Sequence, residues 1–266
     1  MTDCRTWWAL LPAGACAALL LTVGGPGGAQ GEPPEMRMTP VDFPTRGDDA
    51  VRLEGRLLVP TGTAGRLPAA VVCHPDPRRS GTMYDAVVAA VVDELVRRGF
   101  AALIFNFRGV GGSTGEFAGG VGEVADTLGA LDFLAQQQQA DPERLFLGGY
   151  SFGSVMALKA AARDDRVKGW AGVSFPFGSR TKDPGEYDWV REVRPLPLMF
   201  ISGDRDEYSD LERIRGVTGD RQPPPNFLLV EGADHFWPLA PSLLEQAAVA
   251  AAEFLRSPAE PAAAEA

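Results

Sequence analysis

The feature that most limits the fold is the stretch 149–153, Gly-Tyr-Ser-Phe-Gly, with Ser151 at its centre. An apolar run, 144–148, precedes it, and a helix-compatible run of small and apolar residues, 154–162, follows it. A strand that turns this sharply into a helix forces its central residue into a strained backbone conformation. The residues two before and two after that position must lack a Cβ, and both are glycine here. The pattern predicts a nucleophile elbow that presents Ser151 where a strand ends.

Two later residues stand where the partners of such a serine are expected. Asp206 follows an apolar, strand-like run at 196–202, and His235 follows another at 227–230. Serine, acid and histidine occur in this chain order in one form of the catalytic triad, with the acid and the histidine each after a later strand. A loop histidine that caps the final helix is the alternative interpretation of His235.

The chain has only two histidines, so the role of the other one matters. His74 follows the third expected strand, 69–73, whereas the triad histidine follows the last strand. We therefore expect His74 to shape an oxyanion hole. Such a hole needs the amide after the nucleophile, from Phe152, and an amide from the loop after the third strand. The prolines on either side of Asp76 have no N–H, which leaves the Asp76 amide as the donor between them; a turn that the prolines merely stiffen is the alternative.

Four stretches of the chain together resemble a known group of proteins. They are HPDPRRSGTMYDAVV, FNFRGVGGSTGEFAGGVGEVAD, GYSFGSVMAL and GADHFW. The chain resembles the small, mostly bacterial hydrolases of the α/β-hydrolase superfamily that are related to dienelactone hydrolases and serine aminopeptidase-like enzymes, over roughly residues 41–256. The resemblance implies Ser151 as nucleophile, Asp206 as acid and His235 as base. Asp204 follows the same strand as Asp206, and spacing alone does not choose between them.

The chain departs from this family at one position near the site. The family commonly has a second histidine where this chain has Asp76. A carboxylate beside an oxyanion site would oppose the developing negative charge unless it points away or pairs with Arg78 or Arg79. The substrate preference of relatives is therefore not transferred to this chain.

Strand and helix patterns alternate along the chain, which predicts an α/β-hydrolase fold: a mostly parallel sheet of about eight strands with helices on both faces. The expected strands are 38–43, 51–59, 69–73, 101–107, 145–148, 169–175, 196–202 and 227–230. The expected helices are 82–98, 121–136, 152–163, 210–215 and 243–255. Between the sixth and seventh strands, 176–195 leaves room for an irregular loop with one helical turn near 187–190, and thus for no sizeable cap domain.

The two ends of the chain differ from the domain, which we place at 36–257. Residues 1–35 resemble a signal peptide, with small residues suited to cleavage near Ala29, and would send the protein to the periplasm or outside the cell. The alternative is an over-long gene prediction, with a cytoplasmic protein that starts near Met36. The Ala, Pro and Glu tail 258–266 is predicted to be disordered.

Composition and motifs limit the partners. A formal net charge of −10 without a basic stripe argues against nucleic acid, and no stable membrane span is expected in the domain. The glycines at 109, 111 and 115 do not have the spacing of a dinucleotide loop, and the acidic residues at 204–210 lack a metal-binding pattern, so no cofactor and no metal are expected. The expected partner is a small-molecule acyl substrate.

These features predict a serine hydrolase that cleaves a carboxylic ester of a small soluble substrate through an acyl-enzyme. Thioesterase or peptidase action with the same triad remains an alternative, as does a non-catalytic binding module on a hydrolase fold. The candidate walls of the substrate pocket are His74, Tyr84, Trp189, Phe236 and Trp237.

Overall fold

A computed structural model describes residues 35–177, 184–237 and 241–259 of the protein. The expected leader, apart from Glu35, and residues 260–266 of the expected tail lie outside the described residues. In the described part of the chain, no helix is both long and apolar enough to span a bilayer.

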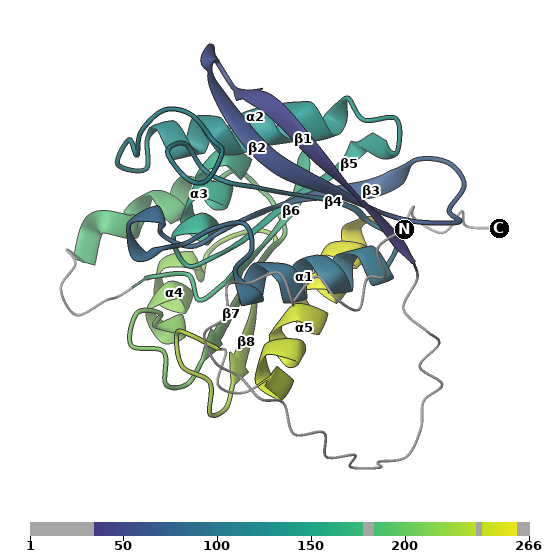
Figure 1. The fold of residues 1–266 in the computed structure, drawn as a ribbon. Coiled ribbons are helices and arrows are strands. Elements are labelled where there is room, and N and C mark those ends of the chain that lie inside the picture. The colour runs from purple at the N-terminus through teal and green to yellow at the C-terminus, as the bar shows by residue number, and fades with distance from the viewer. Residues whose placement is uncertain (1–34, 178–183, 238–240, 260–266) are drawn as a thin grey trace, which may run out of the picture.

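Eight strands form one sheet in the order β1-β2-β4-β3-β5-β6-β7-β8 (Figure 1). The strands are β1 (Met36–Thr45), β2 (Asp48–Pro60), β3 (Leu67–Cys73), β4 (Ala101–Phe105), β5 (Ala140–Tyr150), β6 (Val167–Val173), β7 (Leu198–Gly203) and β8 (Asn226–Val230). The pairs β1/β2 and β2/β4 are antiparallel, and every other pair is parallel. The parallel strands all end at one edge of the sheet, which gathers the loops that follow them.

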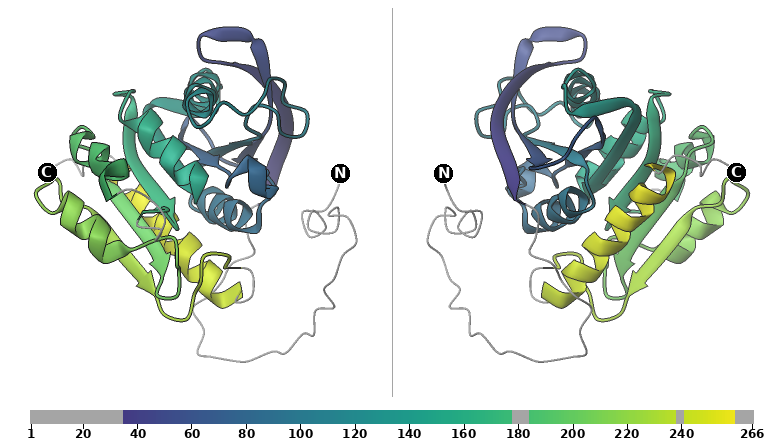
Figure 2. Two further views of the ribbon diagram at one scale, coloured as in Figure 1. Left: turned by 90° about the vertical axis from the view of Figure 1, so that its left-hand side faces the viewer. Right: turned by 90° about the vertical axis from the view of Figure 1, so that its right-hand side faces the viewer.

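Helices cover both faces of this sheet, as the two side views show (Figure 2). The α-helices are α1 (Ala86–Arg97), α2 (Gly122–Ala135), α3 (Phe152–Ala161), α4 (Leu211–Thr218) and α5 (Pro241–Ala259), with 3-10 helices η2 (Pro77–Arg79) and η3 (Pro184–Glu192). One buried cluster joins α1 and α5 to one face, and another joins α2 and α3 to the opposite face. The expected fold class is confirmed.

The central strands are continuous runs of apolar residues because both faces of the sheet are buried. In β3, Ala69 and Val71 belong to the cluster beneath α2 and α3, whereas Ala70 and Val72 belong to the cluster beneath α1 and α5. All four are at most 2% exposed. The alternation of side chains along a strand thus supplies both cores from one segment.

The bounds of several helices differ from those expected from the sequence. Helix α1 begins four residues later than expected, because the carboxylate of Asp85 accepts the amide hydrogen of Val87 at 2.8 Å and so caps the helix there. Helix α5 continues to Ala259 and takes up the first residues of the expected tail. Between β6 and β7, η3 occupies nine residues instead of one helical turn.

Candidate active site

Ser151 occupies the tight turn between β5 and α3 with φ 51° and ψ −121°, a positive φ that is strained for a residue with a Cβ. A Cβ on Gly149 would lie 2.5 Å from the carbonyl carbon of Gly153, and one on Gly153 would lie 2.3 Å from the carbonyl oxygens of Cys73 and His74. The two glycines therefore let α3 pass directly over β5 and β3. The hydroxyl of Ser151 is presented at the carboxyl edge of the sheet.

Two hydrogen bonds connect Ser151 to a carboxylate. Its hydroxyl lies 2.9 Å from Nε2 of His235, and Nδ1 of His235 lies 2.9 Å from Oδ1 of Asp206. With Nδ1 protonated and donating to Asp206, Nε2 is free to accept the serine hydrogen. His235 is 8% exposed and Asp206 is 9% exposed, so water competes little for these bonds. In this arrangement His235 can take a proton from Ser151, and Asp206 can stabilise the imidazolium that results.

The structure brings Asp206, and not Asp204, to the histidine. Asp206 also accepts the amide hydrogen of Tyr208 at 2.9 Å and the hydroxyl hydrogen of Ser202 at 3.3 Å, which fixes both of its oxygens. Asp204 is exposed and accepts the amide hydrogen of Gly232 at 2.7 Å. Two neighbouring carboxylates thus have separate partners.

His235 is positioned by contacts that the sequence did not reveal. The hydroxyl of Tyr150 donates to the backbone carbonyl of His235 at 2.6 Å. Burial raises the pKa of Tyr150, so this hydroxyl keeps its proton. The ring of Tyr208 lies 4.6 Å from the imidazole ring between centroids, and the ring of Phe236 lies edge-on at 5.5 Å. Tyr150 stands inside the elbow motif, but nothing local shows that its hydroxyl reaches a residue 85 positions away.

The two amides expected to form an oxyanion hole both belong to residues that line the cavity beside Ser151. The amides of Phe152 and Asp76 make no hydrogen bond to a described residue. The carboxylate of Asp76 turns to Arg78, accepting from its Nη2 at 2.7 Å and from its backbone amide at 2.9 Å. Burial alone would raise the pKa of Asp76, but the hydrogen bonds and charge of Arg78 lower it overall. The carboxylate is therefore an ion-paired anion at the side of the site.

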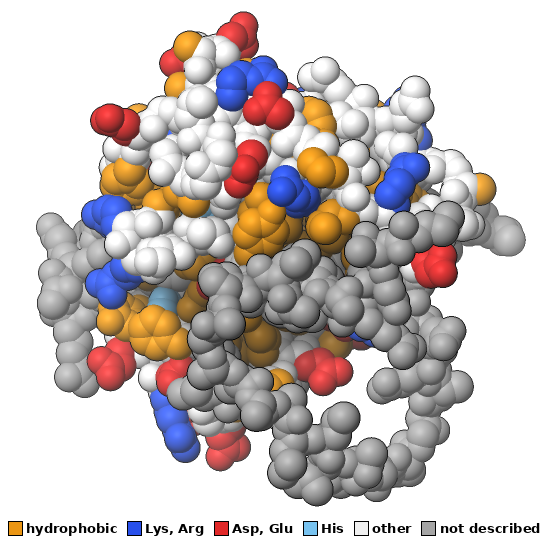
Figure 3. All heavy atoms as spheres, in the orientation of Figure 1, with side chains coloured by type: hydrophobic (Ala, Val, Ile, Leu, Met, Phe, Trp, Pro, Cys, Tyr) orange, Lys and Arg blue, Asp and Glu red, His pale blue; other side chains and the backbone are white. Residues whose placement is uncertain are grey.

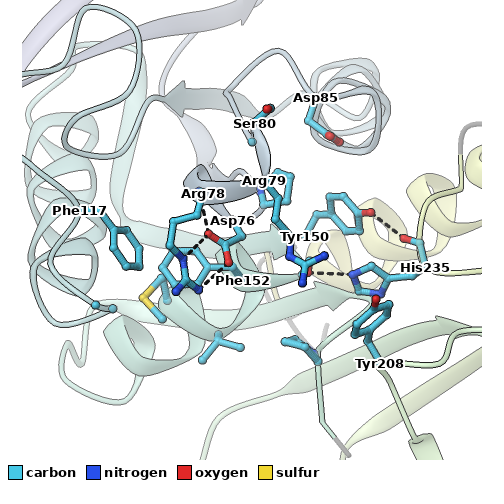
Figure 4. A pocket seen from close by; sticks show the side chains of 18 of the residues that line it. Asp76, Arg78, Arg79, Ser80, Asp85, Phe117, Tyr150, Phe152, Tyr208 and His235 are labelled. Carbon is cyan, nitrogen blue, oxygen red and sulfur yellow. Dashed lines mark hydrogen bonds and ion pairs between the residues drawn. The ribbon is translucent and has the colours of Figure 1, made fainter. Parts of the chain in front are cut away.

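A cavity of about 530 Å³ opens above Ser151 and His235 (Figure 4). Trp189 from η3 and Phe236, which is 57% exposed, line it as expected from the sequence. Other lining residues were not expected, among them Arg79, Phe117, Tyr150, Met156, Lys159 and Tyr208. The space-filling view shows histidine surface among hydrophobic and basic side chains on one side of the molecule (Figure 3).

Three residues expected in the pocket wall lie outside it, which corrects the sequence-based expectation. His74 is fully buried: its Nδ1 donates to the carbonyl of Pro75 at 2.7 Å, and its Nε2 accepts the amide hydrogen of Phe107 at 3.0 Å. Burial lowers its pKa to about 4, so the ring is a neutral link between two loops. Trp237 is 2% exposed and donates to the hydroxyl of Ser174 at 2.9 Å. Tyr84 packs at the margin of the core beneath α1.

Comparisons with known proteins show what this chain is similar to. The family model of X-Pro dipeptidyl-peptidase (S15 family) matches residues 48–174, a span that contains Ser151 and ends before Asp206 and His235. The uncharacterised protein RP471 of Rickettsia prowazekii is 33% identical over 192 residues, which cover 70% of this chain and 78% of that protein. The uncharacterised protein Rv2307c of Mycobacterium tuberculosis is 28% identical over 205 residues, and the match spans 64% of its length.

Solved structures of α/β serine hydrolases are also similar to this chain. An alpha-beta serine hydrolase homologue from Coxiella burnetii is 27% identical, with a TM-score of 0.65 over 78% of this chain and 95% of that one. XC6422 from Xanthomonas campestris, a serine hydrolase without a lid, is 26% identical, with a TM-score of 0.69 over 84% of this chain and 97% of that one. This chain belongs to the α/β-hydrolase superfamily and to its α/β serine hydrolases.

Proposed function

We propose that this hydrolase cleaves carboxylic esters of small soluble molecules through an acyl-enzyme on Ser151. The observation that carries the proposal is the unbroken path of hydrogen bonds from the Ser151 hydroxyl through His235 to Asp206, each 2.9 Å long. The φ of Ser151 is positive, and a Cβ on either neighbouring glycine would clash with the backbone. A turn that presents a nucleophile is the simplest explanation of both features.

In the proposed mechanism, Nε2 of His235 takes the hydroxyl proton as Ser151 attacks the carbonyl carbon of the ester. Asp206 keeps Nδ1 protonated and stabilises the imidazolium that forms. The amides of Phe152 and Asp76 donate to the oxygen that becomes negative. Collapse of the tetrahedral intermediate transfers the proton from Nε2 to the departing alcohol. Water, activated by His235 in the same way, then releases the acid and restores the hydroxyl of Ser151.

Peptidase action is the second candidate, because the family model of an X-Pro dipeptidyl-peptidase matches the part of the chain that contains the nucleophile. Thioesterase action uses the same residues, since the triad does not choose the leaving group. A binding module without catalysis is the candidate from another class. It leaves the strained backbone of Ser151 without a purpose.

Labelling with a fluorophosphonate probe tests whether Ser151 is an activated nucleophile. The wild-type protein is expected to be modified at Ser151, and Ser151→Ala and His235→Ala to be unmodified. Thermal unfolding of Ser151→Ala should stay close to that of the wild type, because the glycines keep the elbow. An unmodified wild-type protein would favour the binding module.

A hydrolysis screen separates the reaction classes. Purified protein is offered short esters, the matching thioesters and an aminoacyl-proline anilide, and kcat/KM is measured for each. Ester turnover that exceeds the others, and that falls by several orders of magnitude in Ser151→Ala, supports the proposal. Faster cleavage of the anilide would assign the protein to the peptidases.

A further inference from the structure

The rim of the cavity carries an arginine, Arg79, whose side chain makes no hydrogen bond or ion pair with a described residue, although its backbone amide donates to the carbonyl of Asp76 at 2.9 Å. Arg79 belongs to the loop after β3 and lines the cavity. In the close-up view its side chain runs from that loop across the cavity toward His235 (Figure 4). Its neighbour Arg78 is held by Asp76 at 2.7 Å and so points to a different wall. Two adjacent arginines thus differ in that only the side chain of Arg78 has a hydrogen-bonding partner among the described residues.

The acidic groups of the cavity are already engaged elsewhere. Asp76 is close enough for the charge of Arg79 to affect its pKa, but both of its oxygens accept hydrogen bonds from Arg78. Asp85 is the cap of α1 and accepts the amide hydrogen of Val87 at 2.8 Å. The lining also includes Lys159, whose ammonium lies 5.4 Å from the ring centroid of Trp189.

Cations therefore outnumber carboxylates in the lining by three to two, in a protein with a formal net charge of −10. Since Asp76 is paired with Arg78, the Arg79 side chain adds positive charge to this lining. An anionic molecule that the rest of the surface repels would be attracted at this place.

A second polar group faces the same opening. The hydroxyl of Tyr208 makes no hydrogen bond to a described residue, while the ring lies 4.6 Å from the imidazole of His235 between centroids. In Figure 4 the Arg79 guanidinium lies to the left of the His235 ring, and the Tyr208 side chain lies just below that ring. A guanidinium and a phenol are both donors to a carboxylate, and a guanidinium binds one in a planar, two-point contact.

We infer that Arg79, with the hydroxyl of Tyr208, recognises a carboxylate on the ester, a few bonds from the carbonyl that Ser151 attacks. The preferred substrate is then a half-ester of a short dicarboxylic acid, or an ester whose leaving alcohol carries a carboxylate. This inference rests on the proposed function, because it names the substrate class of the same site. Arg79 is a specificity residue that binds the group beside the reaction and takes no part in proton transfer.

The test compares matched charged and neutral esters. Values of kcat/KM are measured for mono-(4-nitrophenyl) adipate against its methyl ester, and for 4-acetoxybenzoate against its methyl ester. The first pair places the carboxylate on the acyl side and the second on the leaving group. Wild type, Arg79→Gln and Arg79→Lys are compared with Arg37→Gln, which removes one exposed positive charge outside the cavity lining.

We expect the wild type to prefer the charged member of at least one pair, and the preference to shrink in 0.5 M salt. Arg79→Gln should lower kcat/KM for that charged ester by about 10-fold to 100-fold, mainly through KM, and should lower the neutral value far less. Arg79→Lys should recover part of the loss, and Arg37→Gln should match the wild type. Equal losses on charged and neutral esters, or a wild type without preference, would overturn the inference.

A binding measurement distinguishes a failure of the inference about Arg79 from a failure of the proposed function. If none of the esters is hydrolysed and the fluorophosphonate does not label Ser151, the proposed function is wrong. Calorimetric binding of adipate then decides the inference alone. Binding that is about tenfold weaker in Arg79→Gln than in wild type and Arg37→Gln supports it, and equal or undetectable binding in all three contradicts it.

Discussion

At the scale of single residues, the choice between two neighbouring carboxylates depends on their partners. Asp206 accepts from Nδ1 of His235, whereas Asp204 binds a loop amide and is exposed. Asp206→Asn should lower kcat by about 10³-fold to 10⁴-fold, since a neutral amide cannot hold the imidazole in the required tautomer. Asp204→Asn is the matched control, and we expect a change below about fivefold because an amide oxygen can still accept from Gly232. Equal small effects would place the acid elsewhere.

The second histidine makes a prediction about stability and pH. The pKa of His74 is about 4 in the folded protein, against 6.5 for an ordinary histidine. Between these values the unfolded chain binds a proton that the folded protein refuses, so the free energy of unfolding falls as pH drops through 6.5 toward 4. The loss between pH 7 and pH 4.5 should be about 2 kcal/mol.

Urea unfolding of wild type and His74→Gln at both pH values measures this contribution. The pH-dependent loss should be smaller by that amount in His74→Gln, whatever the stability of the variant at pH 7. An NMR titration of the His74 ring in the wild type is the independent measurement. A ring that titrates near 6.5 would refute the prediction.

At the scale of elements, the ends of β7 and β8 set the distance between acid and base. A Cβ on Gly203, the last residue of β7, would lie 1.9 Å from the carbonyl oxygen of Ala233, in the loop that carries His235. Gly203→Ala must therefore push this loop away from Asp206. We expect a loss of stability of about 2–4 kcal/mol and a fall in kcat larger than the fall in folded fraction.

Gly216→Ala is the matched control for this prediction. Gly216 lies within α4, and a Cβ there would meet nothing within 4 Å. The substitution should stabilise the helix by a few tenths of a kcal/mol to about 1 kcal/mol, with unchanged kcat. If the two variants behave alike in chemical unfolding and in turnover, contact between the two loops does not matter.

The segment between β6 and β7 shows why local patterns were incomplete. Arg221 donates to the carbonyls of Val190 and Val193 at 3.3 and 2.5 Å, and Arg194 donates to the carbonyl of Val167 at 2.5 Å. Arg221 thus satisfies carbonyls around the end of η3 from about 30 positions away, and Arg194 connects the chain after η3 to the start of β6. The local sequence indicated one helical turn because it contains no sign of a partner so distant. Helix η3 brings Trp189 to the wall of the cavity.

At the scale of the whole molecule, the substrate is limited by a cavity of about 530 Å³ over which the described residues form no cap domain. A site of this size accommodates a small acyl group. We expect kcat/KM for 4-nitrophenyl esters to be highest for acyl chains of about two to six carbons, and the rate to show no jump when a substrate exceeds its solubility. Tributyrin assays across the solubility limit check the second point. Faster turnover of long chains with interfacial activation would contradict both expectations.

The sequence by itself determined the parts of this protein that depend on short stretches of chain. The elbow around Ser151 follows from sterics within five residues, and the layered sheet follows from runs of apolar residues. Ser151, Asp206 and His235 each follow a different strand along the chain, and the structure brings the three within hydrogen-bonding distance. Their catalytic roles remain a prediction that the variants above test.

Only the tertiary structure decided which side chains face the cavity. Two residues that follow β3 differ in burial: His74 is fully buried, whereas the side chain of Arg79 reaches over the opening of the cavity. Tyr150 and Trp237, which flank Ser151 and Phe236 in the chain, bind the interior through hydrogen bonds to residues 85 and 63 positions away. The direction of a loop side chain depends on the partners that other segments bring to it. Those partners become neighbours only when the chain has folded.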